Sequence, residues 1–127
     1  MINKVKKEFF DNIINSDYSL ATRGKGNFSH RLYEILCCGR IPLFVNTDCV
    51  LPFENQINWK EHCIWVEYKD IKYFDKIINE FHNSIDSNSF IRMQQSNRIL
   101  WKEWLSPEGF YLKIINNIIN KFKYNFI

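Results

Sequence analysis

Apolar residues along the chain recur at two kinds of spacing, and each spacing predicts one kind of element. Residues 3–15 place an apolar residue at every third or fourth position among Lys, Glu, Asp and Asn, which predicts an amphipathic helix. Residues 18–22 predict a short strand, and residues 28–38 return to helical spacing. Gly39 then ends this second helix in the manner of a C-terminal cap.

Two further apolar runs predict parallel strands. Residues 41–45 form a continuous apolar run that is too short for a helix, as buried parallel strands are. Residues 63–67 predict another strand. Because strand, helix and strand in this order form a βαβ unit, we expect an α/β protein. The expected architecture is a Rossmann-like parallel sheet of about three to four strands flanked by helices.

The second half of the chain has helical spacing. Apolar stripes at residues 71–81 and 90–105 predict two helices, and Ser106 with Pro107 predicts the start of a last one, since serine caps helices and proline suits their first turn. Residues 106–127 carry a broad isoleucine-rich face that would cover the sheet or dock to another domain. No repeat, linker or low-complexity tract is present, so residues 1–127 are expected to form a single domain.

Composition supports one folded domain and narrows its partners. Of the 127 residues, 46% are hydrophobic and 24% are charged, which argues against long disordered segments. The net charge of +3 comes from dispersed lysines and suits a small anionic ligand at least as well as a polynucleotide. Apolar runs are only a few residues long, so no membrane span is expected, and the chain does not begin with a signal-peptide core.

The cysteines and histidines predict neither a disulfide framework nor a metal site. Four cysteines lie within residues 37–63, and their spacing fits no paired CxxC zinc site. Reduced thiols are typical of the cytoplasm, which is the expected location. His30, His62 and His82 lie in different predicted elements and are expected to be surface or helix-face histidines. Only His30 lies beside the candidate site, where it is a candidate phosphate contact. No Asp-x-Asp sequence occurs, so no bound metal is expected.

The stretch between the first strand and the second helix is the most informative part of the sequence. Amide groups in the first turn of a helix are unpaired, and the helix dipole is positive there, so a diphosphate would fit. Arg23 and Lys25 would add positive charge, and Ser29 a hydroxyl donor. Gly24 and Gly26 permit backbone angles that other residues resist, and they would let the backbone come close to phosphate oxygens.

Two charged residues follow on the polar side of the second helix. Arg31 suits a phosphate, and Glu34 suits the diol of a ribose, although a local salt bridge between them is an alternative. Ligands bind beyond the carboxyl ends of parallel strands, so Asp48 is a candidate contact for the sugar or base, or else a plain turn residue. The candidate binding residues are therefore Arg23, Gly24, Lys25, Gly26, Asn27, Ser29, Arg31, Glu34 and Asp48.

Several motifs taken together resemble one protein family. Residues 23–34 read Arg-Gly-x-Gly-x-Phe-Ser-x-Arg-Leu-Tyr-Glu, and they are followed by Gly-x-Ile-Pro at residues 39–42, Leu-Pro-Phe at residues 51–53 and Ile-Asn-Trp at residues 57–59. In order and spacing they resemble the C-terminal region of exostosin-like glycosyltransferases. The resemblance is strong over residues 18–65 and fainter at Asn-Arg-x-x-Trp and Ser-Pro near the end of the chain.

This resemblance implies the nucleotide-sugar-binding C-terminal half of a GT-B enzyme, in which two Rossmann-like halves face each other. It implies inverting transfer from a nucleoside-diphosphate sugar, UDP-linked, to a glycan or glycoconjugate, without a cofactor. Arg23, Arg31 and Glu34 would then contact the donor phosphate and ribose. Thr47 departs from the family pattern, which often has an acidic residue there. The acceptor, and the catalytic base that deprotonates it, would belong to a separate N-terminal acceptor domain.

Two other functions are alternatives. A truncated, non-catalytic nucleotide-sugar-binding or protein-interaction module would fit the short length. A small nucleic-acid-binding domain would use some of the four tryptophans as stacking platforms, but their strand and helix spacing is more typical of packing. We therefore expect no nucleic-acid partner, since such a partner would predict binding that weakens steeply with added salt.

Overall fold

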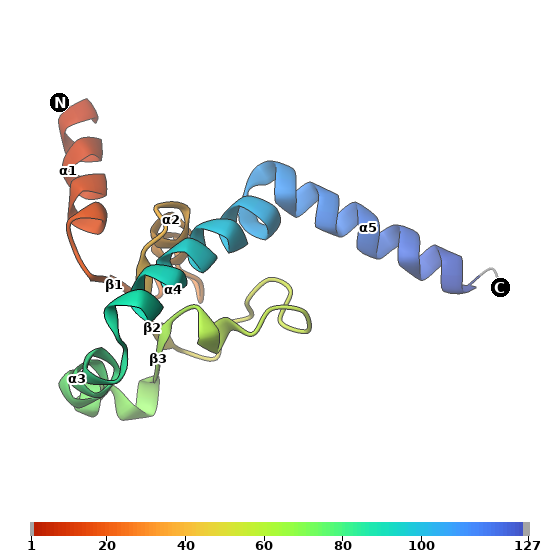
Figure 1. Ribbon diagram of the computed structural model, residues 1–127. Coiled ribbons are helices and arrows are strands. Elements are labelled where there is room, and N and C mark those ends of the chain that lie inside the picture. The colour runs from red at the N-terminus through yellow and green to blue at the C-terminus, as the bar shows by residue number, and fades with distance from the viewer. Residues whose placement is uncertain (1, 126–127) are drawn as a thin grey trace.

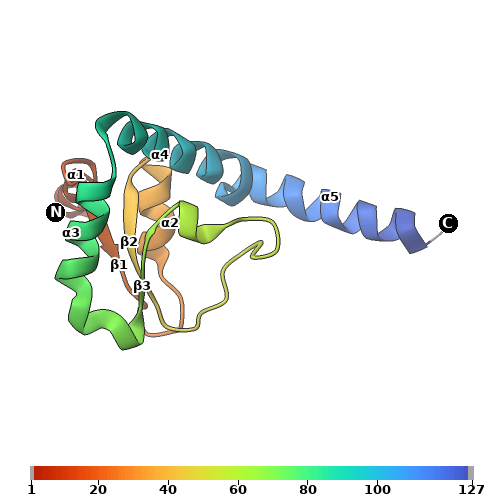
Figure 2. The ribbon, with the colours of Figure 1, turned by 60° about the horizontal axis from the view of Figure 1, so that its bottom comes forward.

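Three short parallel strands lie at the centre of the protein (Figure 1 and Figure 2). The computed structural model describes residues 2–125. Strands β1 (Tyr18–Ala21), β2 (Ile41–Asn46) and β3 (Ile64–Glu67) pair in the order β1-β2-β3, and both pairings are parallel. The predicted α/β architecture with a Rossmann-like parallel sheet is confirmed, with three strands.

Helices precede, connect and follow these strands. They are α1 (Ile2–Ile14), α2 (His30–Cys37), α3 (Phe74–Ser84), α4 (Ser87–Leu100) and α5 (Pro107–Asn125). Two short segments of other helical types interrupt the predicted stripes. A 3-10 helix at Tyr68–Tyr73 separates β3 from α3, and a π-helical turn at Trp101–Leu105 joins α4 to α5.

The sheet is covered by helices on both faces, as Figure 2 shows with α2 and α3 on opposite sides of the strands. Residues of a strand point alternately to its two faces. On one face, α2 packs Leu32, Ile35 and Leu36 with Ala21 and Phe44 of the strands. The other face packs against α3 and α4, through Ile41, Leu43, Ile64, Val66, Phe74, Ile77, Ile78, Phe81, Phe90 and Met93.

One fully buried asparagine joins α4 to the beginnings of two strands. The Nδ2 atom of Asn97 donates to the backbone oxygens of Arg40 and His62, each at 3.0 Å. Its Oδ1 atom lies 2.8 Å from the His62 Nδ1 atom. Because Arg40 precedes β2 and His62 precedes β3, this side chain links α4 to both strands.

Two predicted helix boundaries are confirmed by their capping geometry. Gly39 follows α2 with a φ of 63°, in the left-handed region that favours glycine. The Ser106 Oγ atom accepts a hydrogen bond from the Gly109 amide at 3.1 Å, which caps the first turn of α5.

Helix α5 projects away from the rest of the protein (Figure 1). Its polar side faces its own domain, where Asn117 pairs with Gln56 and the Lys113 Nζ atom lies 4.0 Å from the centre of the Trp104 ring. The isoleucine-rich side therefore does not cover the sheet, and its docking to another domain stays a prediction. Side chains of the apolar side that are 45–67% exposed include Tyr111, Leu112, Ile115, Ile118 and Ile119.

No helix within residues 2–125 is both long and apolar enough to cross a membrane.

Replacing Gly109 with alanine should destabilise the protein. A Cβ atom there would lie 2.5 Å from the Glu103 carbonyl oxygen, so the turn before α5 would have to move. Alanine gains about 1 kcal/mol of helix propensity over glycine, and overpacking outweighs that gain. We expect a net loss of about 1–3 kcal/mol in the free energy of unfolding, measured by urea denaturation.

A matched control is Gly24→Ala, because no heavy atom beyond the adjacent residues lies within 4 Å of a Cβ at Gly24. This variant should stay within about 0.5 kcal/mol of the parent protein. Equal losses in the Gly24 and Gly109 variants would show that the close approach of Gly109 to Glu103 is not the cause.

Candidate functional site

The basic loop between β1 and α2 (residues 22–29, called the glycine loop) and the turn after β2 are joined at the carboxyl end of the sheet. Asn27 donates through Nδ2 to the Thr47 backbone oxygen at 3.1 Å, and Thr47 donates through Oγ1 to Asn27 Oδ1 at 2.6 Å. The loop also closes on itself, because the Gly24 amide donates to the Phe28 carbonyl at 3.0 Å. The structure thus brings together the two segments that the sequence placed at one edge of the sheet.

The first turn of α2 lacks a side-chain cap. Ser29 occupies the N-cap position in an extended conformation, yet its hydroxyl makes no capping hydrogen bond. Ser29 is only 7% exposed, and its Oγ atom has no hydrogen-bond partner. Buried polar atoms are seldom left unpaired, so this position has unused capacity for hydrogen bonds. The turn at which the sequence predicts an anion site therefore has amides that no side chain pairs.

Two predicted basic contacts are accessible, and the two glycines of the loop differ in their surroundings. Arg23 and Lys25 are both exposed. Among the glycines of residues 2–125, only Gly39 has a positive φ, so Gly24 and Gly26 do not use the backbone angles that glycine permits. Gly24 lies in open space, while a Cβ at Gly26 would lie 2.5 Å from the Phe28 ring. Gly26 therefore makes room for that ring.

Arg31 contacts helix α1. Its Nη2 atom donates to Asn12 Oδ1 at 2.8 Å, and its guanidinium carbon lies 4.5 Å from the centre of the Phe9 ring. Within residues 2–125 the one salt bridge joins two residues of α3, so Arg31 and Glu34 do not form the local ion pair that was the alternative. Arg31 helps to hold α1 against α2, and its contact with a donor phosphate stays a prediction.

The remaining predicted residues lie around the loop. Glu34 is partly exposed on α2, one turn beyond Arg31. His30 is exposed, and its ring meets the Phe28 ring edge-on with centroids 5.0 Å apart. Asp48 is exposed in the turn after β2 and has a φ of 56°. A positive φ is uncommon outside glycine, but aspartate adopts it more often than most residues, as in turns.

Sequence reasoning missed a hydrogen-bonded pair at this edge of the sheet. Asn46 and Glu67 are register partners at the ends of β2 and β3, and Asn46 Nδ2 donates to Glu67 Oε2 at 2.9 Å. Trp65 Nε1 donates to Glu67 Oε1 at 2.8 Å. The hydrogen bonds from Trp65 and Asn46, with the charges of Lys60 and Lys69, hold the pKa of Glu67 below its ordinary value. The available signal was their position at the ends of two predicted strands.

The cysteines are poor candidates for nucleophiles. Burial raises the pKa of Cys63 to about 12 and also raises the pKa of Cys38 and Cys49, so these thiols stay protonated near neutral pH. All four cysteines are free. Within the described part of the chain, no three His, Cys, Asp or Glu side chains gather where they could hold a metal ion.

Comparison with known proteins identifies the family. A family model described as the Exostosin GT47 domain matches residues 3–81, which include α1, the glycine loop, α2 and the Asn46–Glu67 pair. The chain belongs to the exostosin GT47 family. The resemblance found in the sequence motifs is thereby confirmed for this GT47 domain.

Three relatives show how far the similarity to this GT47 domain extends. It is 31% identical over 90 residues to Exostosin-1 of Drosophila melanogaster, which covers 71% of this chain and 11% of the relative. The chain is 25% identical over 120 residues to a probable beta-1,4-xylosyltransferase of Arabidopsis thaliana, which covers 89% of this chain and 28% of the relative. The chain is 33% identical over 70 residues to a probable glucuronosyltransferase of Physcomitrium patens, which covers 55% of this chain and 16% of the relative. The chain therefore spans only 11–28% of the length of these relatives.

Proposed function

We propose that this domain binds a nucleoside-diphosphate sugar, UDP-linked, and serves glycosyl transfer to a glycan or glycoconjugate acceptor. The observation that carries the proposal is the double hydrogen bond between Asn27 and Thr47, beside the uncapped first turn of α2. It fixes a basic loop against the carboxyl end of the central strand, where ligands of open α/β sheets bind. The names of the relatives, which include xylosyl- and glucuronosyltransferases, support the same reaction class.

The proposed chemistry is stabilisation of a leaving group. As the sugar departs, negative charge grows on the diphosphate, and the α2 amides with Arg23 would meet that charge. Glu34 would accept hydrogen bonds from the ribose hydroxyls, and Asp48 would lie near the sugar. We assign the catalytic base to an acceptor-binding half, because the base must reach an acceptor held there. On this proposal the chain is the donor-binding half of a GT-B enzyme.

The first test is a calorimetric titration with UDP. We expect saturable binding that the Arg23→Ala variant weakens about tenfold or more, because one charge-assisted hydrogen bond is worth about 1.5–3 kcal/mol. Arg23 is a better probe than Arg31, since replacing Arg31 also breaks the contacts with Asn12 and Phe9 of α1.

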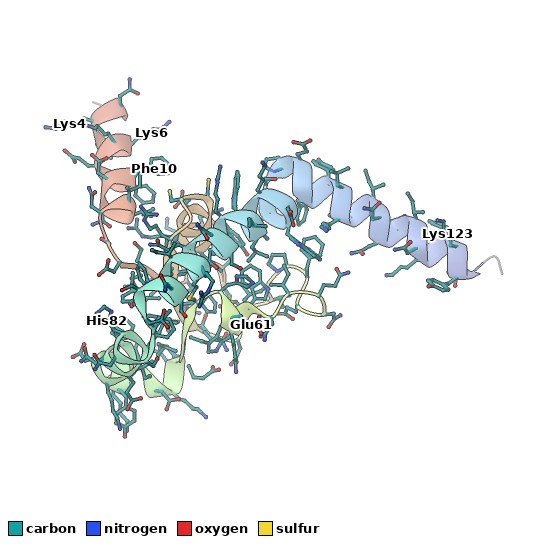
Figure 3. All side chains as sticks on the ribbon, in the orientation of Figure 1. Lys4, Lys6, Phe10, Glu61, His82 and Lys123 are labelled. Carbon is teal, nitrogen blue, oxygen red and sulfur yellow. The ribbon has the colours of Figure 1, made fainter. Side chains whose placement is uncertain are left out.

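A matched control for this titration is Arg92→Ala. Arg92 is an exposed arginine on α4 that bonds Ser89, one turn earlier on the same helix. Absence of UDP binding by the unmodified protein would refute the proposal, and equal weakening in both variants would assign the effect to net charge. Net charge by itself would not direct UDP to one site, because positive side chains are spread over the protein. Figure 3 shows Lys4 and Lys6 on α1 far from Lys123 near the end of α5.

A second candidate function is donor binding without turnover, as a non-catalytic module. What favours it is that the groups of the proposed site bind the donor and its leaving group, while the catalytic base is assigned to an acceptor-binding half. Supplying an acceptor domain in trans and measuring sugar transfer separates the two functions. Transfer would establish the enzyme, and measurable donor binding without transfer would favour the module.

A further inference from the structure

The carboxylate of Glu67 is held at both of its oxygens. Oε1 accepts from the Trp65 indole at 2.8 Å, and Oε2 accepts from the Asn46 amide at 2.9 Å. Both donors come from neighbouring strand positions, so the carboxylate has little freedom to move. The lowered pKa of Glu67, caused by those same hydrogen bonds, means that the group is ionised near neutral pH and accepts from both donors at once.

The restraint on Glu67 passes through Asn46 to the turn that follows β2. While its Nδ2 atom donates to Glu67, the Oδ1 atom of Asn46 accepts from the Asp48 amide at 3.1 Å. Asp48 has a φ of 56°, in the left-handed region, which aspartate enters more readily than most residues with a side chain. The hydrogen bond from the Asp48 amide to Asn46 stabilises this conformation, and Glu67 orients the asparagine that accepts the bond.

The same turn is held from the other side by the glycine loop. Thr47 makes two hydrogen bonds with Asn27, on the side of β2 that faces β1. Glu67 lies at the end of β3, on the opposite side of β2. Asp48 is therefore fixed between two anchors while its carboxylate is exposed to solvent.

We propose that Glu67 is a positioning residue for the sugar of the donor: through Asn46 it fixes the turn whose Asp48 carboxylate accepts hydrogen bonds from the sugar hydroxyls. This inference rests on the proposed function, because it needs a diphosphate at the glycine loop to bring a sugar to the turn. Carboxylate oxygens accept strongly from hydroxyl groups, and a hydroxyl-rich sugar is the ligand class that an exposed and fixed carboxylate suits. Glu67 acts through Asn46 and does not touch the sugar.

The test compares affinities for UDP and for UDP-xylose, a donor with a neutral sugar, by calorimetry on the whole chain. The quantity that decides is the ratio of the UDP-xylose dissociation constant to the UDP dissociation constant. We expect Asp48→Ala and Glu67→Ala each to raise this ratio about tenfold, while UDP binding changes by no more than about twofold. The double variant should raise the ratio no further than either single variant, since both changes disable one contact.

Glu67→Gln keeps the length of the side chain and can still accept one of the two hydrogen bonds, so its ratio should fall between those of the parent and Glu67→Ala. It also serves if Glu67→Ala fails to fold. An unchanged ratio in the Glu67 variants, or a double variant whose effects add, would overturn the positioning role. Equal loss of UDP and UDP-xylose binding would assign Glu67 to stability alone. If the unmodified protein binds no UDP, the donor site itself is wrong and this inference falls with it.

Discussion

Replacing Asn97 with alanine should cost the protein about 3–5 kcal/mol of stability, a large part of what a small domain has. The change leaves the backbone oxygens of Arg40 and His62 and the Nδ1 atom of His62 without their partner, at a part-buried site around the fully buried Asn97 side chain. Each unpaired buried group costs about 1–3 kcal/mol, and a cavity adds to the loss. Urea denaturation followed by circular dichroism measures the effect.

The control for this change is Asn79→Ala. Asn79 is an exposed asparagine on α3, so its replacement should change the free energy of unfolding by no more than about 0.5 kcal/mol. A loss below about 1 kcal/mol for Asn97→Ala would mean that water replaces the lost hydrogen bonds, and that Asn97 does not hold α4 to the sheet.

Replacing Glu34 with alanine should weaken UDP binding about tenfold or more and leave inorganic pyrophosphate binding unchanged. The proposed partner of Glu34 is the ribose diol, which UDP has and pyrophosphate lacks. A hydrogen bond to a charged group is worth about 1.5–3 kcal/mol, which sets the size of the expected loss. Parallel calorimetric titrations with the two ligands measure both affinities.

Glu80→Ala is the control for Glu34→Ala. Glu80 lies on α3, on the other face of the sheet, and its exposed ion pair with Lys76 contributes little to stability. If Glu34→Ala weakened both ligands equally, the carboxylate would act on the fold or on the loop, and the ribose contact would be wrong.

The sequence predicted the sheet well because its signals were local. The apolar run before Asn46 and the glycine after α2 act on their immediate surroundings, and both predicted elements end where expected. The boundaries that differ also have local causes. The helix predicted from residue 71 begins as a 3-10 helix at Tyr68–Tyr73. Because a short 3-10 helix has nearly the same spacing of apolar residues as an α-helix, the sequence pattern does not separate the two.

The features that could not be predicted depend on partners distant in the sequence. Nothing near Asn97 indicates that it bonds a carbonyl 57 residues earlier, or that the partner of Arg31 is an asparagine 19 residues upstream. Glu67 is an ordinary strand-end residue until Asn46 is placed beside it. For α5 the pattern defined two sides but not which one faces the domain, and the structure turns the polar side inward.

Most of α5 extends away from the rest of the protein, so the position of its far end depends on how its first turn is held. The helix is held at its first turn by the Ser106 cap and the close approach of Gly109 to Glu103, and further along by the contacts of Lys113 and Asn117. Its 19 residues make a rod about 28 Å long. A rotation of about 10° at the first turn would move the far end of the helix by about 5 Å. The direction of the rod is thus sensitive to a few atoms around Gly109, and small changes there would redirect the whole isoleucine-rich surface.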